Sequence, residues 1–314
     1  MAVNNVSQLP EILGTAHLVG KFENQSPEWH EQRAKGIGGS DAGVLAGLSP
    51  WQSPYTWAAK RVGLIEDNLE PSEAMFWGTT LESVILDVWA KDHPEFILHR
   101  EVGTWCHQDR PWQQANPDAI YEFSNEDPAL GEDQDVRGYG IIEVKTARYE
   151  DGWNEKTGEI PAHYRAQVLW YLQTFGFARA YVVVLFAGSK MRQFQIDYNE
   201  FEAEANLAAV TEVKAFVDAG TVPDFSAPFT STLQTVREQH PDIDPDGKEE
   251  LGDLFVEYAK VIADEAQAIE QANLAKAKVL AVMGKAKNGL FNGEVVVTRQ
   301  ARNGGTPYLV NKRK

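Results

Sequence analysis

Runs of apolar residues along the chain predict a set of strands followed by helices. Short apolar runs succeed one another between Phe96 and Phe123, and a further run, Gly140–Lys145, is bracketed by residues typical of strand ends. The most apolar run, Ala180–Phe186, predicts a strand inside the sheet, with Met191–Asp197 as its hairpin partner. Consecutive strands with short connections predict an antiparallel meander that helices cover.

Apolar residues that recur every three or four positions predict the helices. Ser26 followed by Pro27 marks a helix start, because Ser caps the free amides and Pro fits the first turn. Thr79 or Thr80 is expected to cap a second helix, which puts Glu82 in its first turn. Further helices are expected over 50–63, 160–176 and 201–219.

The pattern changes after a linker over 222–228, where we place the boundary between a domain over 1–228 and an extension over 229–314. Residues 248–287 read as one nearly unbroken helix with a heptad-like apolar stripe. Such a helix must pack against its own domain, another subunit or a partner. Asn292-Gly293 then predicts the turn of a β-hairpin.

The net charge of −17 argues against a protein that binds nucleic acid over its whole surface. The charge is uneven, since residues 271–314 hold nine Lys or Arg against Glu294 alone, or +8, which leaves −25 for the remainder. An acidic exterior is compatible with a DNA enzyme when positive potential is confined to a channel. The single cysteine, Cys106, excludes an intrachain disulfide framework and a cysteine-ligated zinc or iron–sulfur site within one chain.

Nothing in the sequence predicts a membrane protein. No apolar run approaches the ~20 residues needed to cross a bilayer, and the N-terminus lacks a basic segment followed by an apolar one. We therefore expect a cytoplasmic protein with no membrane partner.

The candidate chemistry centres on Asp118 and on the strand that carries Glu143 and Lys145. Side chains alternate along a strand, so Glu143 and Lys145 point the same way. Burying a carboxylate and an ammonium in an apolar strand is costly unless a divalent cation and a polarised water compensate. Hard oxygen ligands favour magnesium or manganese over zinc. The alternative is a surface ion pair on an edge strand.

A glycine-rich segment follows Arg33. Gly36, Gly38 and Gly39 free the backbone to approach a ligand, and Ser40 can cap a following short helix whose amides face an anion. The segment is neither a Walker loop nor a dinucleotide fingerprint. A plain turn between two helices is the alternative.

The Asp118…Glu143-x-Lys145 arrangement resembles the signature of the PD-(D/E)xK nuclease superfamily. With its companion motifs, the chain resembles the phage lambda-type exonucleases, also called YqaJ-like viral recombinases. The companion motifs are Arg33 with Ser40 seven residues later, Trp77-Gly78 before Glu82, and Gln167 with Tyr171 four residues later. The resemblance extends from Trp29 to roughly Asp197, and the C-terminal third stands outside it.

The resemblance implies a mixed α/β (α+β) fold, with a restriction-endonuclease-like core of a mixed central sheet flanked by helices. The C-terminal helical arm and its small β-hairpin would be added to this core. Asp118, Glu143 and the Val144 carbonyl would bind Mg²⁺, for which Mn²⁺ would substitute. Lys145 would orient or deprotonate the attacking water.

The resemblance also assigns roles to residues around this centre. Arg33 and Ser40 would hold the 5′-phosphate of a DNA end, and Asn116 stands where the family can place a Ser that completes the pocket. Glu82 would reach the metal through a water or another ligand, and Gln167 would arrange the site. Tyr164 and Tyr171 are candidates for supporting it.

The implied function is a magnesium-dependent 5′-to-3′ exonuclease on linear double-stranded DNA. It would release 5′ mononucleotides and leave 3′ single strands for phage DNA recombination by annealing. Expected partners are a single-strand annealing recombinase and further copies of the chain in a toroidal homo-oligomer, in the host cytoplasm if the chain is phage-encoded. Two alternatives stay open: a restriction-like or branch-resolving endonuclease, which would cut closed circles, and a non-catalytic recombination scaffold.

Overall fold

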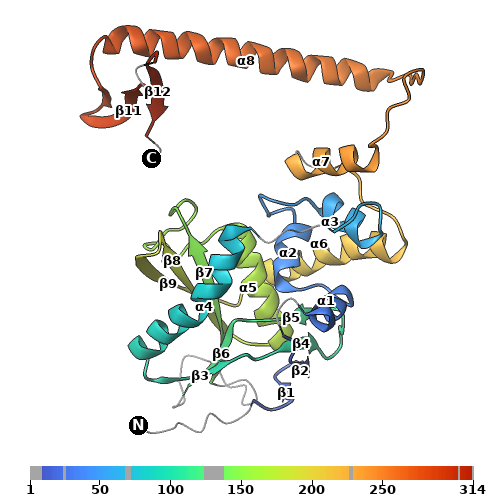
Figure 1. The fold of residues 1–314 in the computed structure, drawn as a ribbon. Helices are drawn as coiled ribbons and strands as arrows, with labels where there is room; N and C mark the ends of the chain where they lie inside the picture. Colours follow the sequence, from blue (N-terminus) through green and yellow to red (C-terminus); the bar gives the residue numbers. More distant parts are fainter. Residues whose placement is uncertain are drawn as a thin grey trace. The chain divides into compact units, whose positions relative to one another are not determined.

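The computed structural model describes residues 9–23, 26–67, 72–123, 138–225, 229–302 and 305–312. The last two basic residues of the tail, Arg313 and Lys314, lie outside this part. The chain divides into two compact units, Met1–Pro241 and Asp242–Lys314. Figure 1 shows the elements of each unit.

The first unit extends past the expected boundary at residue 228 because helix α7 (Thr230–Gln239) belongs to it. This helix packs on α3 (Pro54–Arg61), where the Tyr55 hydroxyl donates to Gln239 Oε1 at 2.8 Å. The Thr235 hydroxyl adds a buried hydrogen bond to Thr56 Oγ1 at 2.8 Å. The sequence showed the linker but not this helix.

A mixed five-stranded sheet forms the centre of the first unit. Its order is β3 (Phe96–Arg100), β6 (Ala119–Phe123), β7 (Tyr139–Ala147), β8 (Arg179–Phe186) and β9 (Lys190–Asp197). The pair β7–β8 is parallel and the other pairs are antiparallel. Helix α5 (Ala162–Phe175) makes the crossover that a parallel pair requires. The predicted mixed sheet with flanking helices is confirmed.

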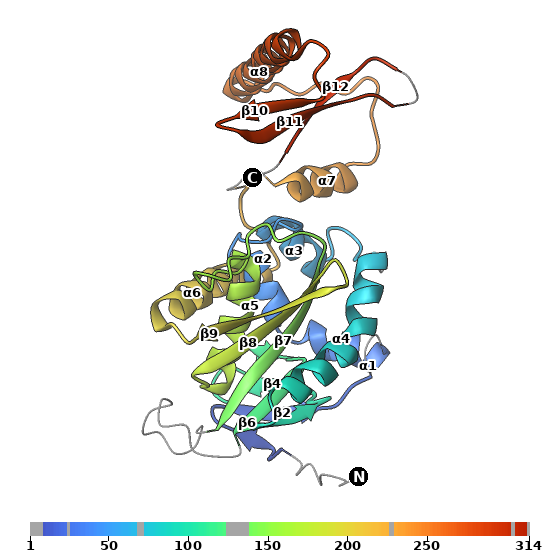
Figure 2. The same ribbon diagram turned by 90° about the vertical axis from the view of Figure 1, so that its left-hand side faces the viewer.

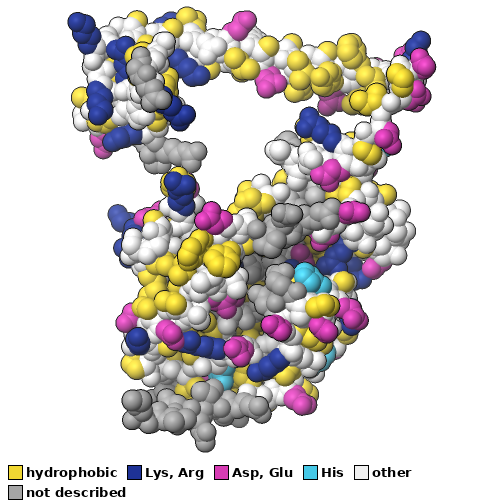
Figure 3. All heavy atoms as spheres, viewed as in Figure 1, with side chains coloured by type: hydrophobic (Ala, Val, Ile, Leu, Met, Phe, Trp, Pro, Cys, Tyr) yellow, Lys and Arg dark blue, Asp and Glu magenta, His cyan; other side chains and the backbone are white. Residues whose placement is uncertain are grey.

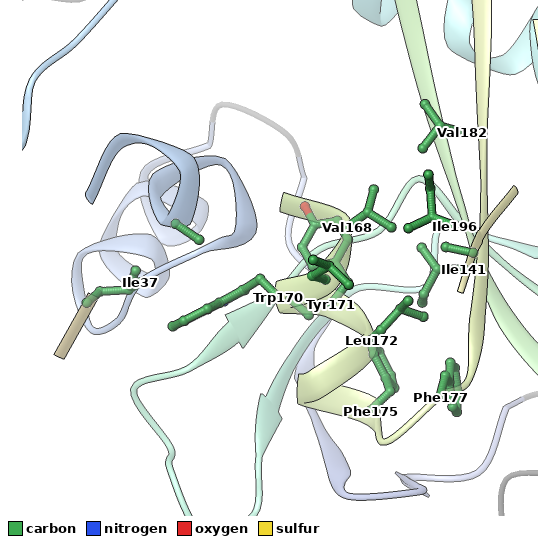
Figure 4. Close-up of a cluster of buried hydrophobic side chains, with 14 of the residues drawn as sticks. Ile37, Ile141, Val168, Trp170, Tyr171, Leu172, Phe175, Phe177, Val182 and Ile196 are labelled. Atoms are coloured by element: carbon green, nitrogen blue, oxygen red, sulfur yellow. The ribbon is translucent and has the colours of Figure 1, made fainter. Parts of the chain in front are cut away.

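The two faces of this sheet are covered by different helices, as Figure 2 shows. Ile142 and Val144 of β7 pack with Trp89 of α4 (Glu73–Asp92). Ile141, which points the opposite way, packs with α5 in the main core. Figure 4 shows side chains of α5 beside those of the sheet in this core. Glu143 and Lys145 share the parity of Ile141, so they lie on the α5 face.

The expectation of one meander is wrong for two of the strands. β4 (Thr104–His107) and β5 (Gln114–Ala115) join a separate four-stranded sheet with β1 (Ile12–Leu13) and β2 (Ala16–Gly20). Strand β2 of the N-terminal hairpin pairs with β4. Because the two strands are far apart in sequence, no local pattern predicts this pairing.

One helix begins as predicted, and two begin elsewhere. Helix α1 (Pro27–Ala34) begins as predicted, with Ser26 Oγ accepting the Trp29 N–H at 3.1 Å. Helix α4 begins before Thr79, because Ser72 Oγ accepts the Met75 N–H at 3.2 Å. Glu82 therefore lies more than two turns inside the helix. In α2 (Gly39–Leu45) the N-cap is Gly38 rather than Ser40.

Helix α6 (Glu200–Asp218) covers the same face as α5.

The second unit contains helix α8 (Asp253–Met283) and an antiparallel sheet of β10 (Asn288–Phe291), β11 (Glu294–Gln300) and β12 (Tyr308–Asn311). The predicted hairpin is confirmed, with Asn292 and Gly293 at φ 51° and 84°, the left-handed values that a tight hairpin turn requires. The strand β12 was not predicted. Among the described residues, no helix combines the length and apolar character needed to span a bilayer.

Candidate active site

A cavity of about 360 Å³ in the first unit collects most of the predicted site residues. Those that line it are Arg33, Ser40, Glu82, Asn116, Asp118, Glu143, Gln167 and Tyr171. They come from α1, α2, α4, β7, α5 and the segment before β6. Trp29 and Thr104 also line the cavity and were not among the predicted residues.

Glu143 and Lys145 form a buried ion pair on β7. The Lys145 ammonium donates to Glu143 Oε1 at 2.5 Å, as expected for side chains two residues apart on a strand. The same oxygen accepts the Gln167 side-chain amide at 2.6 Å. The other oxygen, Oε2, is buried without a hydrogen-bond partner among the described residues. Glu143 is only 2% exposed, so this unpartnered oxygen is costly without a ligand.

Strand register brings Asp118 next to this pair. Ala119 on β6 lies opposite Ile142 on β7, so Asp118 comes opposite Glu143 in the antiparallel pair. Asp118 Oδ2 accepts the Val144 backbone N–H at 2.7 Å. The predicted Asp, Glu and Lys therefore meet where β6 begins, beside the middle of β7.

The carboxylates of the site repel one another. Burial raises the pKa of Asp118 well above its ordinary value, and the charges of Glu143 and Glu82 raise it further. Burial and the Glu143 charge also raise the pKa of Glu82. Burial lowers the pKa of Lys145, but the charges of Glu143 and Asp118 outweigh burial, so its pKa is raised and it stays protonated.

The donor set fits a hard divalent cation. Within the described residues, no three His, Cys, Asp or Glu side chains are grouped closely enough to hold a metal. Asp118 and Glu143 are the two carboxylates that we expect to bind the cation, together with the Val144 carbonyl, and Glu82 lines the same cavity. The unpartnered Glu143 Oε2 and the raised pKa of Asp118 both indicate negative charge that a cation would compensate.

Arg33 and Ser40 meet at the same cavity. The Arg33 guanidinium donates to Ser40 Oγ at 3.2 Å and lies 4.7 Å from the centre of the Trp29 ring. Gly39 is required by close packing, because a Cβ there would lie 2.4 Å from the ring of Tyr171. The predicted glycine-rich segment therefore packs directly on α5.

Tyr171 connects the two halves of the cavity. Its hydroxyl donates to the Asn116 carbonyl at 3.2 Å and accepts the Gln167 amide at 3.2 Å. The Asn116 side-chain amide donates to Thr104 Oγ1 at 2.6 Å. One hydrogen-bonded chain thus runs from Asn116 through Tyr171 and Gln167 to Glu143.

Tyr164 and His163 lie behind Lys145. The Tyr164 ring centre is 5.0 Å from Lys145 Nζ, a cation–π contact. Burial and the charge of Lys145 lower the pKa of His163 to about 4. Its Nε2 is buried without a hydrogen-bond partner among the described residues, and its ring packs on Trp51. Sequence reasoning missed His163, since a lone histidine before Tyr164 carries no motif.

Residues 28–178 match the family model of the YqaJ-like viral recombinase domain. This region therefore resembles the YqaJ-like viral recombinase family, as the motifs in the sequence predicted. The matched recombinase domain ends just before β8. It contains every predicted site residue, from Arg33 to Tyr171.

Two curated relatives resemble parts of this chain. The YqaJ protein of Bacillus subtilis is 28% identical over 185 residues, which cover 58% of this chain and 53% of the relative. Protein D345L of African swine fever virus is 36% identical over 66 residues, or 21% of this chain and 19% of the relative. The chain thus spans about half the length of the YqaJ protein.

Two solved structures resemble part of this chain distantly. The alkaline exonuclease LHK-Exo from Laribacter hongkongensis is 19% identical, with a TM-score of 0.45 over 62% of this chain and 95% of that chain. A phage-related exonuclease from Haemophilus somnus is 11% identical, with a TM-score of 0.42 over 59% of this chain and 94% of that chain.

Proposed function

We propose that this chain is a magnesium-dependent 5′-to-3′ exonuclease on linear double-stranded DNA. It releases 5′ mononucleotides and leaves 3′ single strands for recombination by annealing. One observation carries this proposal: a single cavity is lined both by the Arg33–Ser40 pair and by the carboxylates of Glu82, Asp118 and Glu143. An anion-binding end and an acidic end in one cavity suit a terminal phosphate and a neighbouring scissile phosphate.

The Arg33 end of the cavity binds the 5′-phosphate. A guanidinium forms charge-assisted hydrogen bonds with phosphate oxygens, and Ser40 Oγ, already 3.2 Å from Arg33, adds a hydroxyl to the same anion. Asn116 completes this pocket by its position on the cavity wall.

Asp118, Glu143 and the Val144 carbonyl would hold Mg²⁺, or Mn²⁺ in its place, at the acidic end. When bound, the ion would supply charge stabilisation at the scissile phosphate and would polarise the attacking water. Lys145 keeps its proton and orients that water, because its pKa is raised. Gln167 holds the Glu143 carboxylate in place through the 2.6 Å hydrogen bond.

The remaining residues support this centre. Glu82 acts through a water from α4, since it lines the same cavity as Glu143 and the charge of Glu143 raises its pKa. Tyr171 fixes Gln167, and Tyr164 packs on the Lys145 ammonium. The partners we propose are linear duplex DNA, a single-strand annealing recombinase and further copies of the chain in a toroidal oligomer, in the cytoplasm of the host cell.

The decisive assay uses linear duplex labelled at either the 5′ or the 3′ end, with Mg²⁺ or EDTA, beside a closed circle. The expected result is magnesium-dependent release of 5′ label as mononucleotide, with the circle spared. Glu143→Gln should abolish release, whereas Glu150→Gln, a surface acid paired with Lys190, should not. A cut circle would indicate an endonuclease, and no hydrolysis in either condition would indicate a scaffold.

The phosphate pocket is tested separately with 5′-phosphoryl and 5′-hydroxyl ends. Arg33→Gln should reduce the preference for the phosphorylated end, while Lys35→Gln should leave it unchanged. Lys35 is a matched control because it lies at the end of the same helix and pairs with Glu31 on the surface. An unchanged preference in Arg33→Gln would remove Arg33 from the pocket.

A further inference from the structure

Helix α8 carries its large apolar side chains on its surface. They are exposed along the helix, from 39% for Val279 to 90% for Val282. The sheet of its own unit covers only the last turn, where Met283 is buried beside Gly289. Figure 3 shows hydrophobic side chains gathered along α8, most densely over its N-terminal half. Helices in proteins gain most of their stability by packing an apolar face, so this face needs a partner.

Most of these side chains follow a heptad repeat. With Tyr258 at position a, the exposed large apolar residues at positions a, d and e are Leu254, Phe255, Tyr258, Val261, Ile262, Ile269, Val279 and Val282. Val256 and Leu274 lie on the other side. The helix has 31 residues, or about four heptads, which is long enough for a coiled coil.

The charges on α8 divide into an acidic and a basic half. Residues 253–267 carry Asp253, Glu257, Asp264 and Glu265 against Lys260, a net charge of −3. Residues 268–283 carry Lys276 and Lys278 against Glu270, a net charge of +1, and Lys285 and Lys287 follow just after the end of the helix. None of the salt bridges among the described residues involves α8. A parallel pair would set like charges side by side, whereas an antiparallel pair sets the acidic half against the basic half.

The residues that flank the stripe favour the same orientation. Position g holds Glu257, Asp264, Gln271 and Lys278 in order along the helix. In an antiparallel pair, position g of one helix faces position g of the other. Glu257 then meets Lys278 of the second helix, and Asp264 meets Gln271.

We propose that α8 pairs antiparallel with α8 of a second copy of this chain. The same helix supplies both complementary halves, which is what a two-fold interface between identical chains requires. An interface with a different partner protein would not require the two halves of α8 to complement each other. The pairing is independent of the nuclease proposal, because α8 lies in the second unit and holds none of the cavity residues.

The apolar seam is tested with two exposed valines of the same helix. Val261 (58% exposed) lies on the stripe, and Val256 (66% exposed) lies on the opposite side. The full chain carrying Val261→Glu should show a clearly lower average mass by sedimentation velocity at a given concentration. Val256→Glu should behave like the unmodified chain. Any association through the first unit is common to both variants, so equal masses for the two would overturn the proposal.

Charge reversal tests the orientation. Glu257→Lys alone and Lys278→Glu alone should each weaken association by on the order of tenfold at low salt, because each creates two repulsive contacts per pair. The double variant should restore it. Glu270→Lys, at position f on the far side, is the matched control. Failure of the double variant to recover would contradict the antiparallel pairing.

Disulfide trapping gives a direct readout of the same contact. Chains carrying Glu257→Cys and Lys278→Cys are mixed and oxidised, and circular dichroism confirms that both keep the helix. Cys106 stays out of the reaction, since it is buried and burial raises its pKa to about 11. Mixed disulfides should dominate. Homodisulfides at position 257 would contradict the pairing of Glu257 with Lys278, and absence of intermolecular bonds would mean that α8 packs within its own chain or on another protein. Either result would refute the proposal.

Discussion

Replacing Asp118 with Asn is expected to stabilise the metal-free protein while it abolishes hydrolysis. Burial and the charges of Glu143 and Glu82 disfavour the ionised form of the Asp118 carboxylate, and together they raise its pKa. The Asn side chain removes the charge, and its carbonyl oxygen can still accept the Val144 N–H. In the unmodified protein this N–H lies 2.7 Å from the Asp118 carboxylate. If Asp118 serves to bind a ligand rather than to stabilise the fold, its replacement should raise stability while it lowers activity.

The size of the effect follows from opposing contributions. Each like charge in the pocket costs ~1.5–3 kcal/mol at an effective dielectric constant of about 20, and the attraction of Lys145 offsets roughly one of them. Making the Val144 hydrogen bond neutral rather than charge-assisted loses about 1 kcal/mol. The net expectation is a gain of about 1–2 kcal/mol in the free energy of unfolding, or a melting temperature higher by ~2–8 °C.

The assay is thermal unfolding at neutral pH in EDTA, repeated in Mg²⁺. In EDTA, Asp118→Asn should melt above the unmodified protein. At a Mg²⁺ concentration near 100 times the dissociation constant, the unmodified protein should gain ~2.7 kcal/mol and the variant much less. Because the folded-state pKa of Asp118 is raised, its penalty is present above that pKa and disappears as pH falls toward the unfolded-state value. The difference between the two proteins should therefore shrink in acid.

A surface acid serves as the control for this comparison. Asp87→Asn removes an exposed ion pair with Arg100 and should change stability by no more than ~0.5 kcal/mol in either direction. If Asp118→Asn melts below the unmodified protein in EDTA, then Asp118 is a structural anchor for Val144, and its charge does not destabilise the metal-free protein.

Three further perturbations test the surroundings of the site. Gln167→Ala should lower turnover by ~10–100-fold with Mg²⁺ saturating, since Gln167 donates to Glu143, the proposed metal ligand; unchanged turnover would make it structural. Gly39→Ala should cost ~1–3 kcal/mol by pushing on Tyr171, whereas Gly38→Ala, whose nearest atom is 3.8 Å away, should cost less; the readout is the melting temperature. His163 has a pKa of about 4, so the folded protein should lose on the order of 1–2 kcal/mol between pH 6.5 and 4 as the unfolded state takes up a proton, after allowance for solvent screening. His163→Gln should flatten that decline in urea unfolding curves, and an equal decline would contradict the low pKa.

Features that depend on neighbours in sequence were predictable. Alternation along β7 put Glu143 and Lys145 on one side, and the ammonium does contact the carboxylate. The cap at Ser26 and the hairpin at Asn292-Gly293 are also local, and both are present.

Features that depend on distant pairings were not predictable. The start of α4 was misplaced because Thr79 and Ser72 are equally good caps, and only packing decides that Gly78 stays inside the helix. β4 pairs with β2, near the N-terminus, instead of joining the expected meander. The register that sets Asp118 opposite Glu143 likewise appears only when β6 and β7 pair.

The order in which the ribosome makes the chain bears on when the cavity can form. Its lining residues extend in sequence from Phe22 to Tyr171, and β7 is held on one side by β8, which is synthesised after all of them. At about 5–20 residues per second, ~8–30 s separate the synthesis of Arg33 from that of the end of β8. A nascent or truncated chain that lacks β8 therefore has no assembled site, and any DNA cleavage by this protein must wait until the whole first unit can fold.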